Sequence, residues 1–191
     1  MVGRGDVAER VVRHAHCPVL VARPSPPGIV LAATDFSDSA LPAVQAGAAE
    51  ASRRSVGFAV LHSLDFGPMI ATTLGGAYAV IPPLPPEEEA RVRTETLESL
   101  RRALDLVHAK GETIVADGDP GLAIIEAAHT LPAQLVVVGT VGRTGLRRLA
   151  LGSVAEAVVR SAPCSTLVMR LHVTGRGGAG QSRPADPVSA A

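Results

Sequence analysis

The fold is decided by the stretch Val136-Val137-Val138-Gly139-Thr140-Val141-Gly142-Arg143-Thr144-Gly145, which continues to Leu151-Gly152-Ser153-Val154. A β-branched run ends at a glycine, a second glycine follows, and a Gly-Ser pair opens a helical pattern, with the spacing G-x2-G-x9-G-S. Backbone N–H groups at glycines and at a helix N-terminus point outward, where the helix dipole favours negative charge. The stretch therefore predicts a strand, a loop that can hold phosphate groups, and a helix.

Length and composition bound the class of protein. A chain of 191 residues can bury the core of one ordinary domain, and 18 basic against 18 acidic side chains leave no net charge. Neutrality, with one Tyr, three Phe and no Trp, argues against nucleic-acid binding. No apolar run reaches the roughly 18 residues of a membrane span, and two cysteines fit a reducing compartment. We expect a cytoplasmic protein that binds neither nucleic acid nor membrane.

The N-terminal segment repeats a later one. Residues 5–23 align with residues 152–170 at a constant offset of 147, and twelve of the nineteen pairs are identical, including Cys17 with Cys164. A repeat of this length indicates a whole domain rather than a solenoid unit. Residues 1–24 are thus predicted to be the last helix and strand of a preceding copy, followed by a linker at 25–28. Either the chain is the tail of a tandem protein, or the extra helix and strand are an addition to one domain.

Apolar strand patterns alternate with helical patterns in the rest of the chain. This alternation predicts an α/β fold, a Rossmann-like open parallel sheet with helices on both faces. Ligands of such sheets bind beyond the carboxyl ends of the strands, where the winding direction reverses. The strands are expected at residues 29–35, 56–62, 112–116, 135–138 and 165–170.

Three details complete the predicted elements. Residues 64–86 are rich in Gly and Pro without a clear period, which indicates an extended loop, a lid or partner surface, or disorder. In the helix that opens at Asp119-Pro120, Leu122, Ile125 and Ala128 are expected to face inward. Residues 171–191 are expected to form a disordered tail, because Gly, Ser, Pro and Ala dominate them.

A carboxylate stands at the end of the first strand of the expected domain. Asp35 would share a rim with Gly139 if their strands are neighbours. There it could accept hydrogen bonds from a ribose or from the edge of an adenine. The alternative is that Asp35 only belongs to the start of the next helix.

Three motifs together resemble the ATP-binding branch of the universal stress protein family. They are Thr34-Asp35-Phe36-Ser37, the glycine stretch, and Pro163-Cys164-Ser165-Thr166-Leu167-Val168-Met169 in the last strand. The resemblance covers residues 29–170. It implies a five-stranded sheet in the order 3-2-1-4-5, in which strands one and four are neighbours, and it implies ATP in the crevice there.

The resemblance also implies which residues surround the nucleotide. The second strand would end at His62-Ser63 beside the nucleoside, although Ser63 stands where the family tends to place an aliphatic residue against adenine. Gln134 is a second departure, at a position where an Asp commonly opens strand four. The implied nucleotide-binding residues are Ala33, Thr34, Asp35, Ser63, Gly139, Thr140, Gly142, Arg143, Gly152, Ser153 and Val154.

The favoured interpretation is an ATP-binding universal stress protein that acts as a nucleotide-dependent sensor or adaptor in a stress response. A Mg²⁺ or Mn²⁺ ion would bridge the phosphates, since no carboxylate is placed to hold it alone. One alternative is a slow ATP hydrolase. The main objection to it is that the sequence shows no convincing nucleophile–base pair. The other is an interaction module whose nucleotide site is vestigial.

The last strand indicates the partners. In the family this strand is often the dimer edge, which implies a homodimer or a pseudo-dimer in addition to an unknown protein partner. We expect Pro18–Ala22 to pair antiparallel with Ser165–Met169 of the same chain. The five residues 24–28 reach about 16 Å at roughly 3.3 Å each, which just spans a gap of about 14 Å. Exchange of this strand with another chain is the rival arrangement.

Overall fold

The computed structural model describes residues 4–66, 69–72, 78–81, 84–140 and 151–170. These residues form a six-stranded sheet, a separate two-stranded hairpin and the helices around the sheet. The sheet strands are β1 (Val19–Val21), β2 (Ile29–Ala33), β3 (Phe58–Leu64), β6 (Glu112–Asp117), β7 (Ala133–Gly139) and β8 (Ser165–Met169). The helices are α1 (Arg4–His14), α2 (Leu41–Arg54), α3 (Pro86–Leu106), α4 (Pro120–Thr130) and α5 (Ser153–Ser161).

The large sheet confirms the predicted fold class. Its strand order is β1-β8-β7-β2-β3-β6, and the strands from β8 to β6 are parallel. From β6 to β8 they follow the order 3-2-1-4-5 that the resemblance implies. The sheet has one strand more than the five of the expected domain, because β1 adds to the edge of β8 in the antiparallel sense.

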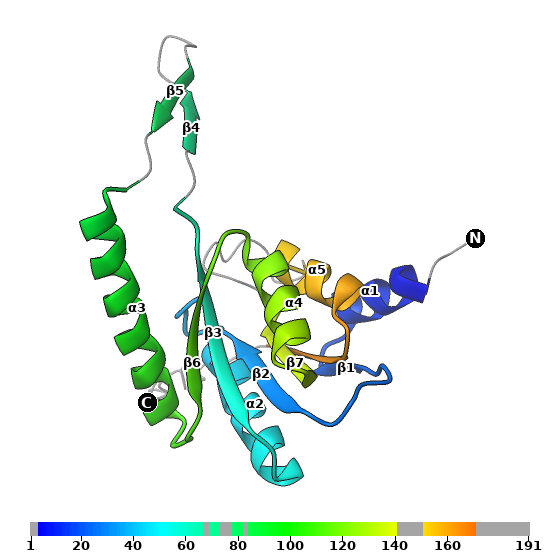
Figure 1. The fold of residues 1–191 in the computed structure, drawn as a ribbon. Coiled ribbons are helices and arrows are strands. Elements are labelled where there is room, and N and C mark those ends of the chain that lie inside the picture. Colours follow the sequence, from blue (N-terminus) through cyan, green and yellow to red (C-terminus); the bar gives the residue numbers. More distant parts are fainter. Residues whose placement is uncertain (1–3, 67–68, 73–77, 82–83, 141–150, 171–191) are drawn as a thin grey trace, which may run out of the picture.

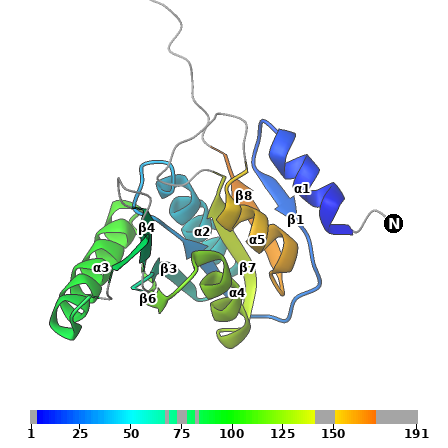
Figure 2. The same cartoon turned by 90° about the horizontal axis from the view of Figure 1, so that it is seen from above.

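Helices cover both faces of this sheet (Figures 1 and 2). Successive residues of a strand point to opposite faces. Val136 and Val138 therefore join the core cluster that includes Val158 of α5, whereas Val137 joins the cluster that includes Val44 of α2. Burial on both faces explains why the central strands read as continuous apolar runs. In the described part of the chain, no helix is long and apolar enough to cross a membrane.

Helix α4 buries only part of the side predicted. Ala128 is buried as expected and Ile125 is half-buried, but Leu122 is 67% exposed, whereas Gly121 and Ile124 are buried. A Cβ on Gly121 would lie only 3.0 Å from the Cβ of Ala157, so α4 is turned to bring its glycine against α5. The prediction for Leu122 is wrong because close helix–helix contact, and not side-chain size, sets the rotation of α4.

The segment 64–86 contains a hairpin that the sequence analysis does not predict. Strands β4 (Met69–Thr72) and β5 (Tyr78–Ile81) pair antiparallel, with Met69 opposite Ile81. In Figure 1 the hairpin stands apart from the large sheet. The prediction of an extended loop is thus wrong for β4 and β5. The Gly75-Gly76 pair between two β-prone runs is the sequence signal that indicates such a hairpin.

The linker into β2 is fastened by Gln134. The Gln134 amide Nε2 donates to the carbonyl oxygen of Gly28 at 2.6 Å, and the Gln134 backbone carbonyl accepts from Ser25 Oγ at 3.1 Å. A Cβ on Gly28 would lie 1.6 Å from the carbonyl oxygen of Pro132, so only glycine fits there. The departure from the family at Gln134 therefore has a structural use, since this residue ties the linker to the start of β7.

The N-terminal arm (residues 4–23, comprising α1 and β1) packs beside the last helix and strand. β1 pairs antiparallel with β8, which confirms the pairing expected between Pro18–Ala22 and Ser165–Met169. Between the two helices, Arg160 Nε lies 2.8 Å from Glu9 Oε1. This hydrogen bond from Arg160 holds the pKa of the Glu9 carboxyl below its ordinary value.

The two cysteines differ in their surroundings. Cys164 is fully buried, and burial raises the pKa of its thiol. Cys17 is exposed. The difference arises because Cys17 precedes β1, which lies at the edge of the sheet, whereas Cys164 precedes a strand with a neighbour on each side.

We expect only Cys17 to react quickly with a chromogenic disulfide reagent under native conditions, because the reactive species is the exposed thiolate. Cys164 should react only after the chain unfolds. Time-resolved thiol titration with and without denaturant measures this, with Cys17→Ser as the control that removes the fast phase. Two fast thiols in the native wild type would contradict the burial of Cys164.

We expect the Glu9→Gln variant to be less stable than the wild type by roughly 1 kcal/mol near neutral pH. The folded-state pKa of Glu9 is lowered, so its contribution is complete above its ordinary pKa of 4.5. The contribution is lost as the pH falls through the lowered value. Denaturant unfolding of both proteins across the acidic range should show the stability difference narrowing. A difference that stays constant with pH would contradict the assignment.

Candidate functional site

A cavity of about 310 Å³ opens at the carboxyl ends of β2 and β7. These two strands are neighbours, with Ala32 opposite Val137, so Asp35 and Gly139 do share one rim as expected. Nine of the eleven predicted nucleotide-binding residues line the cavity. They are Ala33, Thr34, Asp35, Ser63, Gly139, Thr140, Gly152, Ser153 and Val154. The other two, Gly142 and Arg143, lie outside the described residues.

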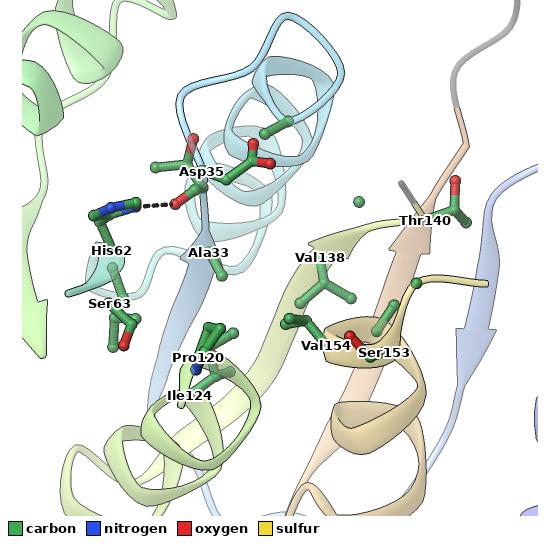
Figure 3. Close-up of a pocket in the computed structure, with 16 residues that line it drawn as sticks. Ala33, Asp35, His62, Ser63, Pro120, Ile124, Val138, Thr140, Ser153 and Val154 are labelled. Carbon is green, nitrogen blue, oxygen red and sulfur yellow. Dashed lines mark hydrogen bonds between the residues drawn. The ribbon is translucent and has the colours of Figure 1, made fainter. Parts of the chain in front are cut away.

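The cavity has two walls of different character (Figure 3). Asp35 and His62, from the ends of β2 and β3, lie on one side, and Ser153 and Val154, at the start of α5, lie on the other. Apolar residues at its base include Val138. One wall can therefore hydrogen-bond a polar ligand, and the other can receive an anion.

Asp35 is held in a fixed orientation by the turn that follows it. Its Oδ1 accepts hydrogen bonds from the backbone N–H of Ser37 at 3.0 Å and from Ser37 Oγ at 2.5 Å. Ser37 Oγ is in turn 2.8 Å from Ser39 Oγ. Both Ser37 bonds go to the same carboxylate oxygen, which fixes the plane of the carboxylate at the rim of the cavity.

The same turn packs two rings together. Phe36 has a positive φ of 63°, and its N–H donates to Thr34 Oγ1 at 3.1 Å. The Phe36 ring lies 4.4 Å from the His62 ring between centroids. His62 Nδ1 donates to the carbonyl oxygen of Thr34 at 2.7 Å, as Figure 3 shows. These contacts join the end of β3 to the end of β2 and stiffen this wall.

The opposite wall is the N-terminus of α5. Gly152 occupies the N-cap position of this helix, which has no side-chain hydrogen bond. The Gly152 N–H donates to the carbonyl oxygen of Thr140 at 2.9 Å, and a Cβ on Gly152 would lie 3.2 Å from that oxygen. Ser153 is the first residue of the helix after this cap. Its exposed position at the first turn leaves the hydroxyl at the mouth of the cavity, beside N–H groups that helices leave unpaired.

Ser63 uses its hydroxyl within the protein. Ser63 Oγ donates to the carbonyl oxygen of Gly118 at 2.5 Å. A ligand beside Ser63 does not have to supply a partner for this hydroxyl. The replacement of an aliphatic residue by Ser63 is for this reason less disruptive to an apolar ligand surface than the sequence alone indicates.

Part of the cavity lining is not predicted from the sequence. Helix α4 begins at the same edge of the sheet and contributes Pro120 and Ile124, and β7 contributes Val138. The signal that could have found the α4 residues is the Asp119-Pro120 helix start. A helix that follows a parallel strand begins at the carboxyl edge, where the ligand site lies. The remaining residues not predicted are Ala40, Leu61 and Ala155.

The fold and the position of the cavity define a class of protein. A parallel α/β sheet with a crevice at the ends of two central strands is typical of Rossmann-like domains that bind a ligand at the reversal of winding. The model of the universal stress protein family matches residues 28–170. The chain therefore belongs to the universal stress protein family.

Individual relatives agree with this assignment. A universal stress protein of Methanocaldococcus jannaschii is 32% identical over 137 residues, which are 72% of this chain and 78% of that protein. One of Mycobacterium tuberculosis is 36% identical over 175 residues, which are 87% of this chain and 53% of that protein. The chain thus spans about half the length of this mycobacterial relative.

A solved structure resembles this fold, and the match covers nearly all of the solved chain. The universal stress protein of Archaeoglobus fulgidus in complex with dAMP has a TM-score of 0.53 and 25% sequence identity. The match covers 75% of this chain and 98% of that chain. The relative in question therefore binds an adenine nucleotide.

Proposed function

We propose that this protein binds ATP in the crevice at the ends of β2 and β7 and acts as a nucleotide-dependent sensor or adaptor in a stress response. The observation that carries the proposal is the pairing of a fixed carboxylate, Asp35, with the N-terminus of α5 across one cavity. The dAMP complex of the Archaeoglobus fulgidus relative supports an adenine nucleotide as the ligand.

Each wall has its own role in this proposal. Asp35 accepts hydrogen bonds from the ribose or from the adenine edge, with Ala33 and Ser63 beside the nucleoside. Thr34, whose carbonyl holds His62, keeps this wall rigid. The phosphates lie against the opposite wall, because unpaired helix N–H groups and the helix dipole favour negative charge there. In this proposal the ribose and phosphates contact Gly139, Thr140, Gly152, Ser153 and Val154 of the described lining. Gly142 and Arg143, which lie outside the described residues, are proposed as further contacts on sequence grounds alone.

We propose that a divalent cation binds only together with the nucleotide. Among the described residues, no three His, Cys, Asp or Glu side chains gather into a metal site. Asp35 is the only carboxylate on the described cavity wall, and its Oδ1 already accepts two hydrogen bonds from Ser37. Phosphate oxygens would thus supply the ligands for Mg²⁺ or Mn²⁺ that the protein side chains do not provide.

Binding is favoured over rapid turnover by the way the polar side chains are engaged. The described lining offers two side chains that could act as a base, Asp35 and His62. Ser37 holds the first, and the Thr34 carbonyl holds the second through Nδ1. Neither is paired with a nucleophilic side chain of the cavity lining in the described hydrogen bonds. A slow hydrolase is the second candidate, and the test below distinguishes it.

We expect calorimetry to show that ATP binds more tightly than AMP, and that Ser153→Asp weakens ATP binding by about tenfold or more. The added carboxylate would repel the phosphates at short range. It would not destabilise α5, because an acidic residue is favourable in the first turn of a helix. Ser153→Asn is the matched neutral control and should stay within about threefold of the wild type.

The other results of this experiment would redirect the assignment. A wild type that binds no ATP would leave an interaction module with a vestigial site. Equal ATP affinity in the wild type and Ser153→Asp would contradict the placement of the phosphates at α5. Phosphate release faster than about one turnover per minute would favour the slow hydrolase.

A further inference from the structure

The N-terminal arm exposes side chains whose counterparts in the sequence repeat are buried. Residues 5–23 repeat residues 152–170, so each of them has a counterpart in or next to α5 and β8. Val11 is 51% exposed, whereas its identical counterpart Val158 is fully buried. Cys17 is exposed, whereas its identical counterpart Cys164 is fully buried. The same side chains are therefore covered in one copy and uncovered in the other.

Helix α4 and strand β7 provide the cover in the second copy. A Cβ on Gly121 of α4 would lie 3.0 Å from the Cβ of Ala157 and 4.0 Å from the Cα of Val154, so α4 contacts this side of α5. Val158 lies on the same side, four residues after Val154. The strand next to β8 is β7, with Leu135 opposite Ser165. Cover of the last helix and strand thus comes from the body of their own domain.

The uncovered side of α1 is not the side that contacts α5. Glu9 and Arg13 form ion pairs with α5. Val7 and Val11 lie four residues apart on another side of the helix, and both are more than half exposed. This outer side of α1 is the equivalent of the side by which α5 contacts α4.

Strand β1 has an uncovered edge that is equivalent in the same way. β8 pairs with β7 along one edge and with β1 along the other. β1 stands at the end of the sheet and pairs with β8 alone among the described strands, as Figure 2 shows. Leu20 is 53% exposed, whereas its counterpart Leu167 packs against the core cluster that includes Val137. The free edge of β1 therefore corresponds to the edge by which β8 pairs with β7.

We infer that the outer face of the arm, formed by Val7, Val11, Cys17 and the free edge of β1, is a docking surface for the body of a second universal stress protein domain. The body means the elements from β2 to β7, without a last helix and strand of its own. Its last strand would pair parallel to β1, and its helix equivalent to α4 would cover the two valines. Pairing satisfies the open strand edge, and the valines add apolar burial.

Arg10 determines which body fits this surface. It is exposed, and it stands where α5 has Ala157, the residue that contacts Gly121. A guanidinium group needs more room than a methyl group and favours an acidic partner. The matching body therefore has a helix that leaves room for Arg10 and offers it a carboxylate. The body of this chain, with Gly121 at that contact, fits the arm less well.

The test joins a second copy of residues 24–151 to the chain in place of residues 1–4, directly ahead of Gly5. The fusion holds a body beside the arm at high effective concentration. It still has only Cys17 and Cys164, because residues 24–151 contain no cysteine. Arg10→Ala removes the mismatch with Gly121. We expect Cys17 of the Arg10→Ala fusion to react with a chromogenic disulfide reagent about tenfold or more slowly than in the unfused Arg10→Ala chain. The fusion that keeps Arg10 should be less protected.

A matched pair of variants shows which face is covered. Adding Val11→Asp to the Arg10→Ala fusion places a carboxylate in the apolar contact, so Cys17 should again react fast. Leu106 is exposed on α3, and Leu106→Asp in the original copy should leave the protection of Cys17 unchanged. Circular dichroism reports whether the added body is folded in each fusion.

Three results would overturn the inference. One is a Cys17 thiol that reacts equally fast in the Arg10→Ala fusion and in the unfused chain, whether or not the added body is folded. Another is protection of Cys17 that persists after Val11→Asp. The third is protection in the unfused wild type that grows with protein concentration, because a second intact copy would then be the occupant of this face.

Discussion

The parallel pairing of β2 with β7 is the constraint on which the rest of the molecule depends. These strands lie at the centre of the sheet, and their residues Val30 to Ala32 and Leu135 to Val138 are almost fully buried. The chain leaves β2 toward α2 on one face, and the helix after β7, α5, lies on the other. A crevice at the carboxyl ends of the two strands follows from this divergence. Asp35 and the start of α5 face each other only because their strands are neighbours.

The edge of the sheet obeys a different constraint, which is the repeat in the sequence. Because α1 and β1 carry the same key residues as α5 and β8, the two segments can meet about a two-fold axis within one chain. An edge strand exposes unpaired backbone groups that invite pairing with another chain. Here β8 finds its partner in the arm. The open edge is moved outward to β1, a strand of three residues.

Much of the fold could be predicted, because burial on both faces leaves a plain apolar pattern and the motifs resemble one family. The order of the five strands was implied by the resemblance to the family, and the antiparallel position of Pro18–Ala22 was expected from the sequence repeat and the family's dimer edge. Local packing could not be predicted in the same way. The rotation of α4 depends on the contact of Gly121 with Ala157, and these two residues lie far apart in the chain. The β4–β5 hairpin was likewise not predicted, because the segment that contains it is rich in Gly and Pro.

In the candidate site, too, the residues set by topology could be predicted and those set by local packing could not. Residues that follow a strand or open a helix, such as Asp35 and Gly152, could be placed at the rim from topology. Pro120 and Ile124 could not, because their presence in the cavity depends on how far α4 leans over β3 and β7. The hydrogen bond of the Ser63 hydroxyl could not be predicted either, because it goes to the carbonyl oxygen of Gly118, which follows β6.

Amide hydrogen exchange with and without ATP would test whether a nucleotide lies between Asp35 and α5, because it reports on each wall of the crevice separately. We expect ATP to protect the backbone N–H groups of Ser153, Val154 and Ala155 at the start of α5 together with those of residues 34–37. The amides of α1 and β1 should not change. Protection confined to one wall, or centred on the N-terminal arm, would contradict a nucleotide held between Asp35 and α5.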